Sequence, residues 1–405
     1  MRSRSGALVG ALAVSTLATG VVQIAVPLEM RQLHATPTQT GVALAMFGFG
    51  MFAFEWVWGA LADRFGYKVP LIASGVLYGI AIVILARAGS VAEIAVAYFA
   101  SAGMMVAAGP LGRSFIGTTL PARLRATGLA LISAMWVFSS AIGSGAGGQL
   151  IERLPITNVL LMAAFLPFVS AALLAVVFRG YRETRGIWRD EDEPRAATVG
   201  SPDFVRVLVV TALIVLLLEI GAGGEGALLP LLVTNHLRLS AADAGLSLFL
   251  LGIFTGLLLI PGGAAADRFG RRRVMVAGAV ISAVGFGAYV LAGSFPVIVA
   301  GTALRALGAA MVWPAATAWI SEAAPHRRHA LVMGLYGEFE NFGVTLGPVI
   351  GGLVWSAYGI QAAFIAYAIA SLATAVVAAV AVAGRPAAAK ILTREVSDDR
   401  QPDRV

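Results

Sequence analysis

Apolar stretches of about twenty residues recur along the whole chain, and each is long enough to cross a bilayer as a helix. The backbone of such a stretch can satisfy its polar groups inside lipid only as an α-helix or in a closed barrel. The chain is 59% hydrophobic and 13% charged, whereas soluble proteins contain about 25% charged residues. We therefore predict an all-α membrane protein. The predicted spans are residues 7–28, 40–61, 69–87, 92–119, 124–147, 157–178, 204–233, 241–263, 273–293, 296–321, 328–355 and 360–383.

The first apolar stretch follows two arginines and resembles a signal peptide at first sight. Its uninterrupted run, residues 6–28, is longer than the roughly 7–15 residues of a cleaved signal core. We expect it to be retained as the first of twelve transmembrane helices.

The basic residues predict the orientation of these helices. Twelve spans place both termini on one side, and that side carries 23 of the 29 basic residues. The other side carries only Arg31, Arg87, Arg153 and Arg238. By the positive-inside rule, both termini are expected in the cytoplasm, with the protein in the cell membrane (inner or plasma membrane).

A polar segment, residues 179–203, divides the spans into two sets of six. The predicted organisation is an N-terminal six-helix bundle (1–178), a cytoplasmic linker (179–203), a C-terminal six-helix bundle (204–384) and a cytoplasmic tail (385–405). The net charge of +7 resides mostly in the loops and termini, which argues against nucleic-acid binding. The chain has no cysteine, and no metal-ligand spacing, phosphate loop or nucleophile–histidine–acid set is apparent. We expect no metal, no cofactor and no enzymatic activity.

The two halves repeat each other at a spacing of 204 residues. The stretch "WGALADRFGYK", residues 58–68, returns as "GGAAADRFGRRR", residues 262–273. Asp63 thus recurs as Asp267, and Pro110 recurs as Pro314. Each half is therefore predicted to be a copy of one six-helix unit, related to the other by an axis along the membrane normal.

The duplicated loop resembles the motif between helices 2 and 3 of the major facilitator superfamily, G-x-L-x-D-R-x-G-R-K. The matching residues are Gly59, Asp63, Arg64, Gly66 and Lys68, repeated as Gly263, Asp267, Arg268, Gly270 and Arg271. Tyr67 stands where the motif usually has a basic residue. The resemblance extends over all twelve helices and implies a transporter with two pseudo-symmetric bundles.

A second motif resembles the G-x-x-x-G-P-x-x-G-G pattern in the fifth helix of proton-coupled exporters of this family. Here it lies in the eleventh predicted helix, at Gly343, Gly347, Pro348, Gly351 and Gly352. Arg305, in the tenth predicted helix, resembles the arginine that the family embeds in helix 4. The corresponding first-half stretches lack the proline and the arginine.

The resemblance also implies a role for the loop motif in gating. In the family, the loop between helices 2 and 3 contacts the start of helix 11 when the cytoplasmic side is closed. Asp63 and Arg64 are accordingly expected to face the helix that begins near Arg328. A carboxylate can accept hydrogen bonds from the free N–H groups at such a helix start.

Seven ionisable residues lie within predicted spans, where each costs about 2.5–3.5 kcal/mol to insert. They are Glu55, Arg113, Glu219, Glu225, Arg305, Glu338 and Glu340. Matching depths in the membrane predict two ion pairs, Glu225 with Arg305 and Glu55 with Arg113.

Three acids then lack an obvious cation: Glu219, Glu338 and Glu340. Burial without a cation disfavours the charged form of a carboxyl group, as proton coupling requires. Glu219, in the middle of its span, is the first candidate. Glu340 shares a helix face with Gly343 and Gly347, whereas Glu338 points the other way, and either acid is a candidate to face the cavity. For each acid, a structural hydrogen bond is an equally good interpretation.

These features predict a secondary active transporter that works by alternating access around one central cavity. The favoured activity is proton-coupled efflux of lipophilic or cationic small molecules by a monomer in the lipid bilayer, with the proton gradient as energy source. One alternative is proton-coupled uptake of a small organic solute by a symporter. Another is a membrane sensor on a transporter scaffold that binds its ligand without moving it.

Overall fold

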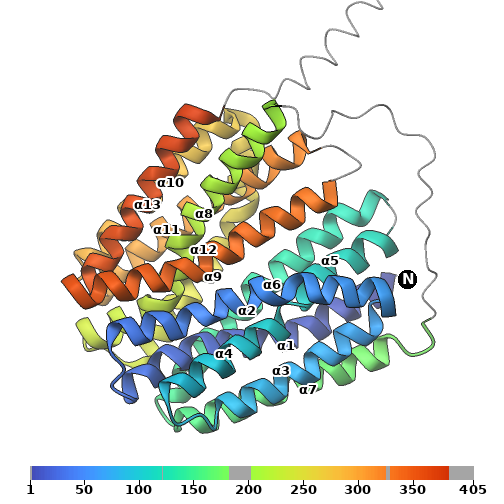
Figure 1. The fold of residues 1–405 in the computed structure, drawn as a ribbon, viewed down its shortest axis with the longest axis horizontal. Coiled ribbons are helices and arrows are strands. Elements are labelled where there is room, and N and C mark those ends of the chain that lie inside the picture. Colours follow the sequence, from blue (N-terminus) through green and yellow to red (C-terminus); the bar gives the residue numbers. More distant parts are fainter. Residues whose placement is uncertain (1, 121, 182–201, 325–328, 383–405) are drawn as a thin grey trace, which may run out of the picture.

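All regular structure in the described part of the chain is helical (Figure 1). The computed structural model describes residues 2–120, 122–181, 202–324 and 329–382. The first half comprises α1 (Arg2–Gln32), α2 (Pro37–Phe65), α3 (Lys68–Leu85), α4 (Val91–Met105), α5 (Ala108–Thr119), α6 (Ala122–Ile151) and α7 (Ile156–Val177). The second half comprises α8 (Pro202–Leu231), the π-helical turn η1 (Leu232–His236), α9 (Ala241–Phe269), α10 (Arg271–Val290), α11 (Phe295–Ala323), α12 (His329–Tyr358) and α13 (Ile360–Ala381).

The predicted all-α membrane fold is confirmed. Eleven helical segments of the described chain are long and apolar enough to cross a membrane, with α4 and α5 counted as one segment. The remaining predicted span corresponds to α12, which carries Glu338 and Glu340 and packs between α2, α8 and α13. Most of the predicted linker and all of the predicted tail lie outside the described residues.

The helices begin and end at signals that repeat at the same spacing of 204 residues. Thr36 and Gln39 form a capping box at the start of α2, and Ser240 and Asp243 form the same box at the start of α9. Both helices end at a glycine with positive φ, Gly66 (79°) and Gly270 (90°). Only glycine adopts this backbone conformation without a steric cost. Each half therefore encodes the same sharp turn into its next helix.

One predicted span is interrupted. The predicted span 92–119 is confirmed as one membrane-crossing segment, Val91–Thr119, but a turn at Val106 and Ala107 separates its two helices, α4 and α5. Pro110 lacks a backbone N–H, and its ring clashes with the carbonyl four residues earlier, which belongs to Val106. Its repeat partner Pro314 lies inside the continuous helix α11, so the break distinguishes the two halves.

The two halves meet along α2 with α12 and along α6 with α9 (Figure 1). We call the side of the bundle where α1 begins and α13 ends the termini face, and the other side the opposite face. Near the opposite face, the backbones of the paired helices touch at glycines. A Cβ atom added to Gly352 would lie 2.7 Å from Cα of Gly41, and one added to Gly148 would lie 2.8 Å from Cα of Gly245.

These two crossings are copies of each other, since Gly41 recurs as Gly245 and Gly148 recurs as Gly352 at the spacing of 204 residues. Toward the termini face, α12 runs away from α2 (Figure 1). The halves are thus joined near one face and separated near the other.

We predict that Gly352→Val separates α12 from α2 at the opposite face, because the added side chain meets backbone atoms that cannot move aside. A cysteine introduced at the buried position Ala45, one turn beyond Gly41, should then react faster with a membrane-impermeant maleimide. The chain has no cysteine of its own, so the reaction reports this position alone.

The matched control is Gly334→Val on the same helix, where an added Cβ meets no atom within 4 Å. Equal labelling rates in the two variants would contradict the assignment of Gly352 as a closing contact.

Candidate functional site

A cavity of about 360 Å³ lies between the two halves and collects most of the intramembrane charges. We call it the central cavity. Its uncharged walls include the indole rings of Trp136 on α6 and Trp313 on α11. Its charged lining consists of Glu55, Arg113, Glu219, Glu225, Arg305 and Glu340. The structure therefore brings together six of the seven predicted intramembrane charges, and only Glu338 is not part of this lining.

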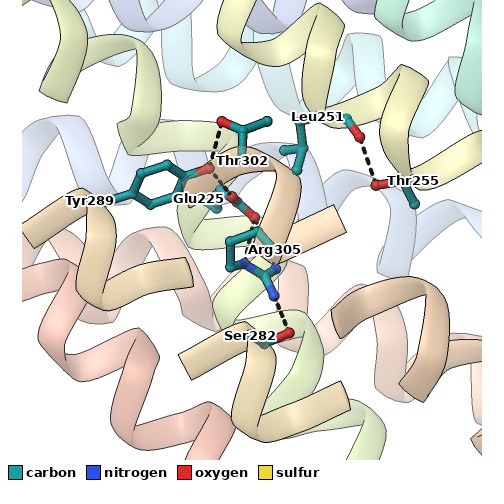
Figure 2. Close-up of polar contacts among 7 residues, drawn as sticks. All are labelled: Glu225, Leu251, Thr255, Ser282, Tyr289, Thr302 and Arg305. Carbon is teal, nitrogen blue, oxygen red and sulfur yellow. Dashed lines mark hydrogen bonds and ion pairs between the residues drawn. The ribbon is translucent and has the colours of Figure 1, made fainter. Parts of the chain in front are cut away.

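Glu225 and Arg305 form the predicted ion pair, between α8 and α11 (Figure 2). Arg305 Nη2 and Nε lie 2.9 Å and 3.0 Å from the same oxygen of Glu225. Both residues are only 1% exposed. The ion pair that was predicted from the matching depths of the two residues in the membrane is confirmed.

Three further side chains satisfy this pair. Tyr289 donates to the second oxygen of Glu225 at 2.7 Å, and Arg305 Nη1 donates to Ser282 at 2.7 Å (Figure 2). The guanidinium also lies 4.1 Å from the ring centre of Phe286. A buried ion pair is stable only when its remaining donors and acceptors are satisfied, and this network meets that condition. Glu225 and Arg305 are thus held in a fixed, mutually neutralised arrangement.

Glu219 is in the opposite situation. It lies on α8, 6 residues before Glu225, and lines the central cavity. Among the described residues, no side chain donates a hydrogen bond to Glu219, and no cation lies within ion-pair distance of it. Its charged neighbours are Glu340 and Arg305, and Arg305 is already bound to Glu225 and Ser282. Glu219 is therefore a cavity-lining carboxyl group without an ion-pair or hydrogen-bond partner among the described residues.

Glu340 faces the central cavity from α12, and this answers which of the two neighbouring acids does so. The indole N–H of Trp313 donates to its carboxylate. Glu338 points to another side, near Glu55, and one of its oxygens is buried without a hydrogen bond. The sequence had left this choice open because it fixes the angle between the two side chains and not the orientation of the helix.

Glu55 hydrogen-bonds across the two halves. Asn341 on α12 donates to it at 2.6 Å. The predicted ion pair between Glu55 and Arg113 is not formed in this conformation: both residues line the central cavity, but no described atoms of the two lie within 4.0 Å as an ion pair. Equal depth in the membrane does not fix the direction of a side chain around its helix axis, and Asn341 reaches Glu55 instead.

The Gly-Pro motif of α12 allows close helix contacts on several sides. A Cβ at Gly343 would lie 2.6 Å from Cβ of Glu219 on α8, and Gly347 also packs against the α8 backbone. Gly351 accommodates the hydroxyl of Tyr367 on α13, and Gly352 contacts α2. Small residues at these positions let the helix backbones approach closely in lipid. The motif thus places Glu219 and Glu340 side by side.

The two aspartates of the duplicated loop motif, Asp63 and Asp267, are both exposed. Arg271 pairs with Asp267 at 3.7 Å and with Glu322 at the end of α11, so these contacts stay within the second half. At the equivalent place in the first half, Tyr67 hydrogen-bonds Ser114 at 2.8 Å. The expected partner near Arg328 lies outside the described residues.

A second cavity of about 230 Å³ adjoins the central cavity toward the opposite face. We call it the deep cavity. Glu219, Met51, Trp136, Ala222 and Val344 line both cavities. No sequence pattern pointed to the deep cavity, because its walls come from six helices and none of its lining residues other than Glu219 is charged.

We predict that Glu225→Gln lowers the free energy of unfolding by about 3 kcal/mol, because it leaves the Arg305 charge buried without a counter-ion. Thermal unfolding of the purified protein in detergent measures this loss. The double variant Glu225→Gln, Arg305→Met should recover much of the stability.

Glu338→Gln is the matched control, since it neutralises an intramembrane glutamate that has no cation partner in the part of the chain that the structure describes. If Glu225→Gln proved as stable as this control, the ion pair would not be the structural element described above.

Comparisons with known proteins agree with this architecture. The sequence model of the Major Facilitator Superfamily matches residues 8–222 and 211–401. An uncharacterized MFS-type transporter, YuxJ of Bacillus subtilis, is 26% identical over 311 residues, covering 76% of this chain and 79% of that protein. The multidrug resistance protein MdtG of Enterobacter lignolyticus is 26% identical over 336 residues, covering 79% of this chain and 76% of that protein.

Among solved structures, the nucleoside transporter NupG superposes with a TM-score of 0.74 at 13% identity, covering 93% of this chain and 98% of that one. Such a likeness concerns the fold alone. The family model spans both halves of the chain, and the chain therefore belongs to the Major Facilitator Superfamily, as a multi-pass membrane transporter.

Proposed function

We propose that this protein exports lipophilic organic cations in exchange for protons. The observation that carries the proposal is the state of Glu219, a cavity-lining carboxyl group with neither a cation nor a hydrogen-bond donor among the described residues. The name of the relative MdtG, a multidrug resistance protein, is consistent with such an activity.

The balance of charge in the central cavity favours a cationic substrate. Four carboxyl groups and two guanidinium groups line it. One carboxylate, Glu225, is neutralised by Arg305, and Glu55 is held by Asn341. Glu219 and Glu340 remain side by side, and a cation between them would relieve their repulsion. Tryptophan faces such as those of Trp136 and Trp313 also attract organic cations.

Exchange at Glu219 couples the export of the organic cation to the entry of protons. Loss of a proton leaves a charge that is costly in a site of low dielectric, and binding of an organic cation compensates it. A returning proton displaces the cation by making the carboxyl group neutral. If only the occupied forms, with a proton or a cation, change conformation, each transport cycle moves one in exchange for the other.

The proposed orientation supports export as the direction of transport. With both termini in the cytoplasm, the separated side of the two halves faces the cell interior, and the central cavity loads from there. The glycine crossings near the opposite face then close the outer side. Lipophilic molecules reach such a cavity from the cytoplasm or from the inner leaflet.

We predict that Glu219→Gln abolishes proton-driven transport. In inside-out membrane vesicles with an acidic lumen, the wild-type protein should accumulate ethidium, and the variant should fall to the background of vesicles without the protein. Exchange of ethidium between equal compartments without a pH gradient should be lost as well, because the neutral amide mimics the protonated carboxyl group, from which the cation is displaced.

Glu338→Gln, a substitution outside the central cavity, should retain proton-driven accumulation and serves as the control. Full activity of Glu219→Gln would refute the role of Glu219. Protons that enter together with a solute would indicate an uptake symporter, and binding without any flux would indicate a sensor.

A further inference from the structure

The deep cavity differs in character from the central cavity. Apart from Glu219, its lining is uncharged. It lies beside the glycine crossings, since Leu44 and Pro348 of its wall belong to the parts of α2 and α12 that cross there. Glu219 stands at the boundary, because it lines both cavities. A molecule that occupies both would therefore place its middle or its charged group beside Glu219.

Three aromatic side chains line the deep cavity. The rings of Phe47 on α2 and Tyr98 on α4 lie 5.2 Å apart between centroids, and Trp136 of α6 lines the same space. Aromatic side chains favour offset or edge contacts with another ring at such distances. A cavity of about 150 Å³ is enough to hold benzene, so a volume of about 230 Å³ has room for a ring with a small substituent.

Two polar groups of the deep cavity have unused hydrogen-bonding capacity. Tyr98 is 4% exposed, and its hydroxyl makes no hydrogen bond to another described residue. Gln23 accepts from Ser140 through its Oε1 at 3.1 Å, and its amide nitrogen donates to no described residue. Buried polar groups normally find a partner. In this cavity, a polar substituent on a bound ring would supply one.

We propose that the deep cavity is a separate subsite that binds a planar aromatic group of the transported molecule. The cationic group of the same molecule then lies at Glu219, and an acceptor on the ring faces Tyr98 and Gln23. The inference rests on the proposed function for the cationic group and adds the second recognition element. The substrate class becomes an aromatic cation whose ring points toward the opposite face.

Gly226 offers a direct way to fill the subsite. It lines the deep cavity on α8, and a Cβ added there meets no atom within 4 Å. Its neighbour Gly223 also lines the deep cavity, but a Cβ there would lie 2.6 Å from the backbone of Val344. Gly226→Leu therefore occupies the space without forcing helices apart, and within a helix leucine is favoured over glycine.

The test compares two cations that differ by one ring, benzyltributylammonium and tetrabutylammonium, by isothermal titration calorimetry on the purified full-length protein. We expect the wild type to bind the benzyl probe up to about tenfold more tightly, as one added aromatic contact allows. Gly226→Leu and Phe47→Leu should each abolish this preference and retain the wild-type affinity for tetrabutylammonium. A 4-cyanobenzyl probe adds a hydrogen-bond acceptor to the ring, and we expect the wild type to bind it more tightly than the benzyl probe. Tyr98→Phe should lose this additional affinity and keep the preference for benzyl over butyl.

The outcomes separate this proposal from the proposed function. If Gly226→Leu keeps the benzyl preference, or weakens both probes equally, the separate subsite is refuted while proton-driven transport of tetrabutylammonium can still be intact. If the wild type binds neither probe, the cationic substrate class fails, and the subsite fails with it. A melting temperature of Gly226→Leu equal to or above that of the wild type confirms that the variant is folded, and Phe47→Leu provides the second, independent test.

Discussion

The architecture depends on the direct contact of glycine backbones between the two halves. In lipid, two helices gain nothing from withdrawing apolar side chains from their surroundings, so their association depends on close packing. Gly41 with Gly352 and Gly148 with Gly245 allow that packing at two symmetric places near the opposite face. Any side chain at these positions would hold the helices apart. The central cavity exists because the same helices, joined at these points, diverge toward the termini face.

The charges around the cavity divide into groups with different physical roles. The Glu225–Arg305 pair is enclosed by Tyr289, Ser282 and Phe286, and every polar atom of the carboxylate has a donor. Such a group is costly to disturb and well suited to hold α8, α10 and α11 together. Glu219, one helical turn and a half away, has no such partner among the described residues. A single helix thus carries one carboxylate that is fixed by its surroundings and, in the proposed function, another that responds to a ligand.

Much of the fold was predictable because the two halves of the sequence repeat the same helix and loop signals. The spacing of 204 residues links the loop motifs, and it also links the capping boxes at Thr36 and Ser240, which confine the helix starts to a few residues. The depth of Glu225 and Arg305 was enough to predict their pairing. Depth alone failed for Glu55, since the direction of its side chain depends on how α2 and α12 are rotated against each other. The break at Val106 also escaped prediction, because the equivalent proline of α11 is tolerated within a continuous helix.

The deep cavity escaped prediction for a deeper reason, which lies in the divergence of the two copies. At the spacing of 204 residues, Arg305 corresponds to Ser101, Glu225 to Val21 and Thr302 to Tyr98. The first half lacks the ionic network of the second half: Tyr98 lines the deep cavity, whereas its counterpart Thr302 hydrogen-bonds Tyr289. The symmetric backbone thus presents a charged wall on one side and an uncharged aromatic wall on the other. In the proposed function, a single ligand between them would meet both walls, an arrangement that suits an amphipathic molecule with a ring at one end and a charge at the other.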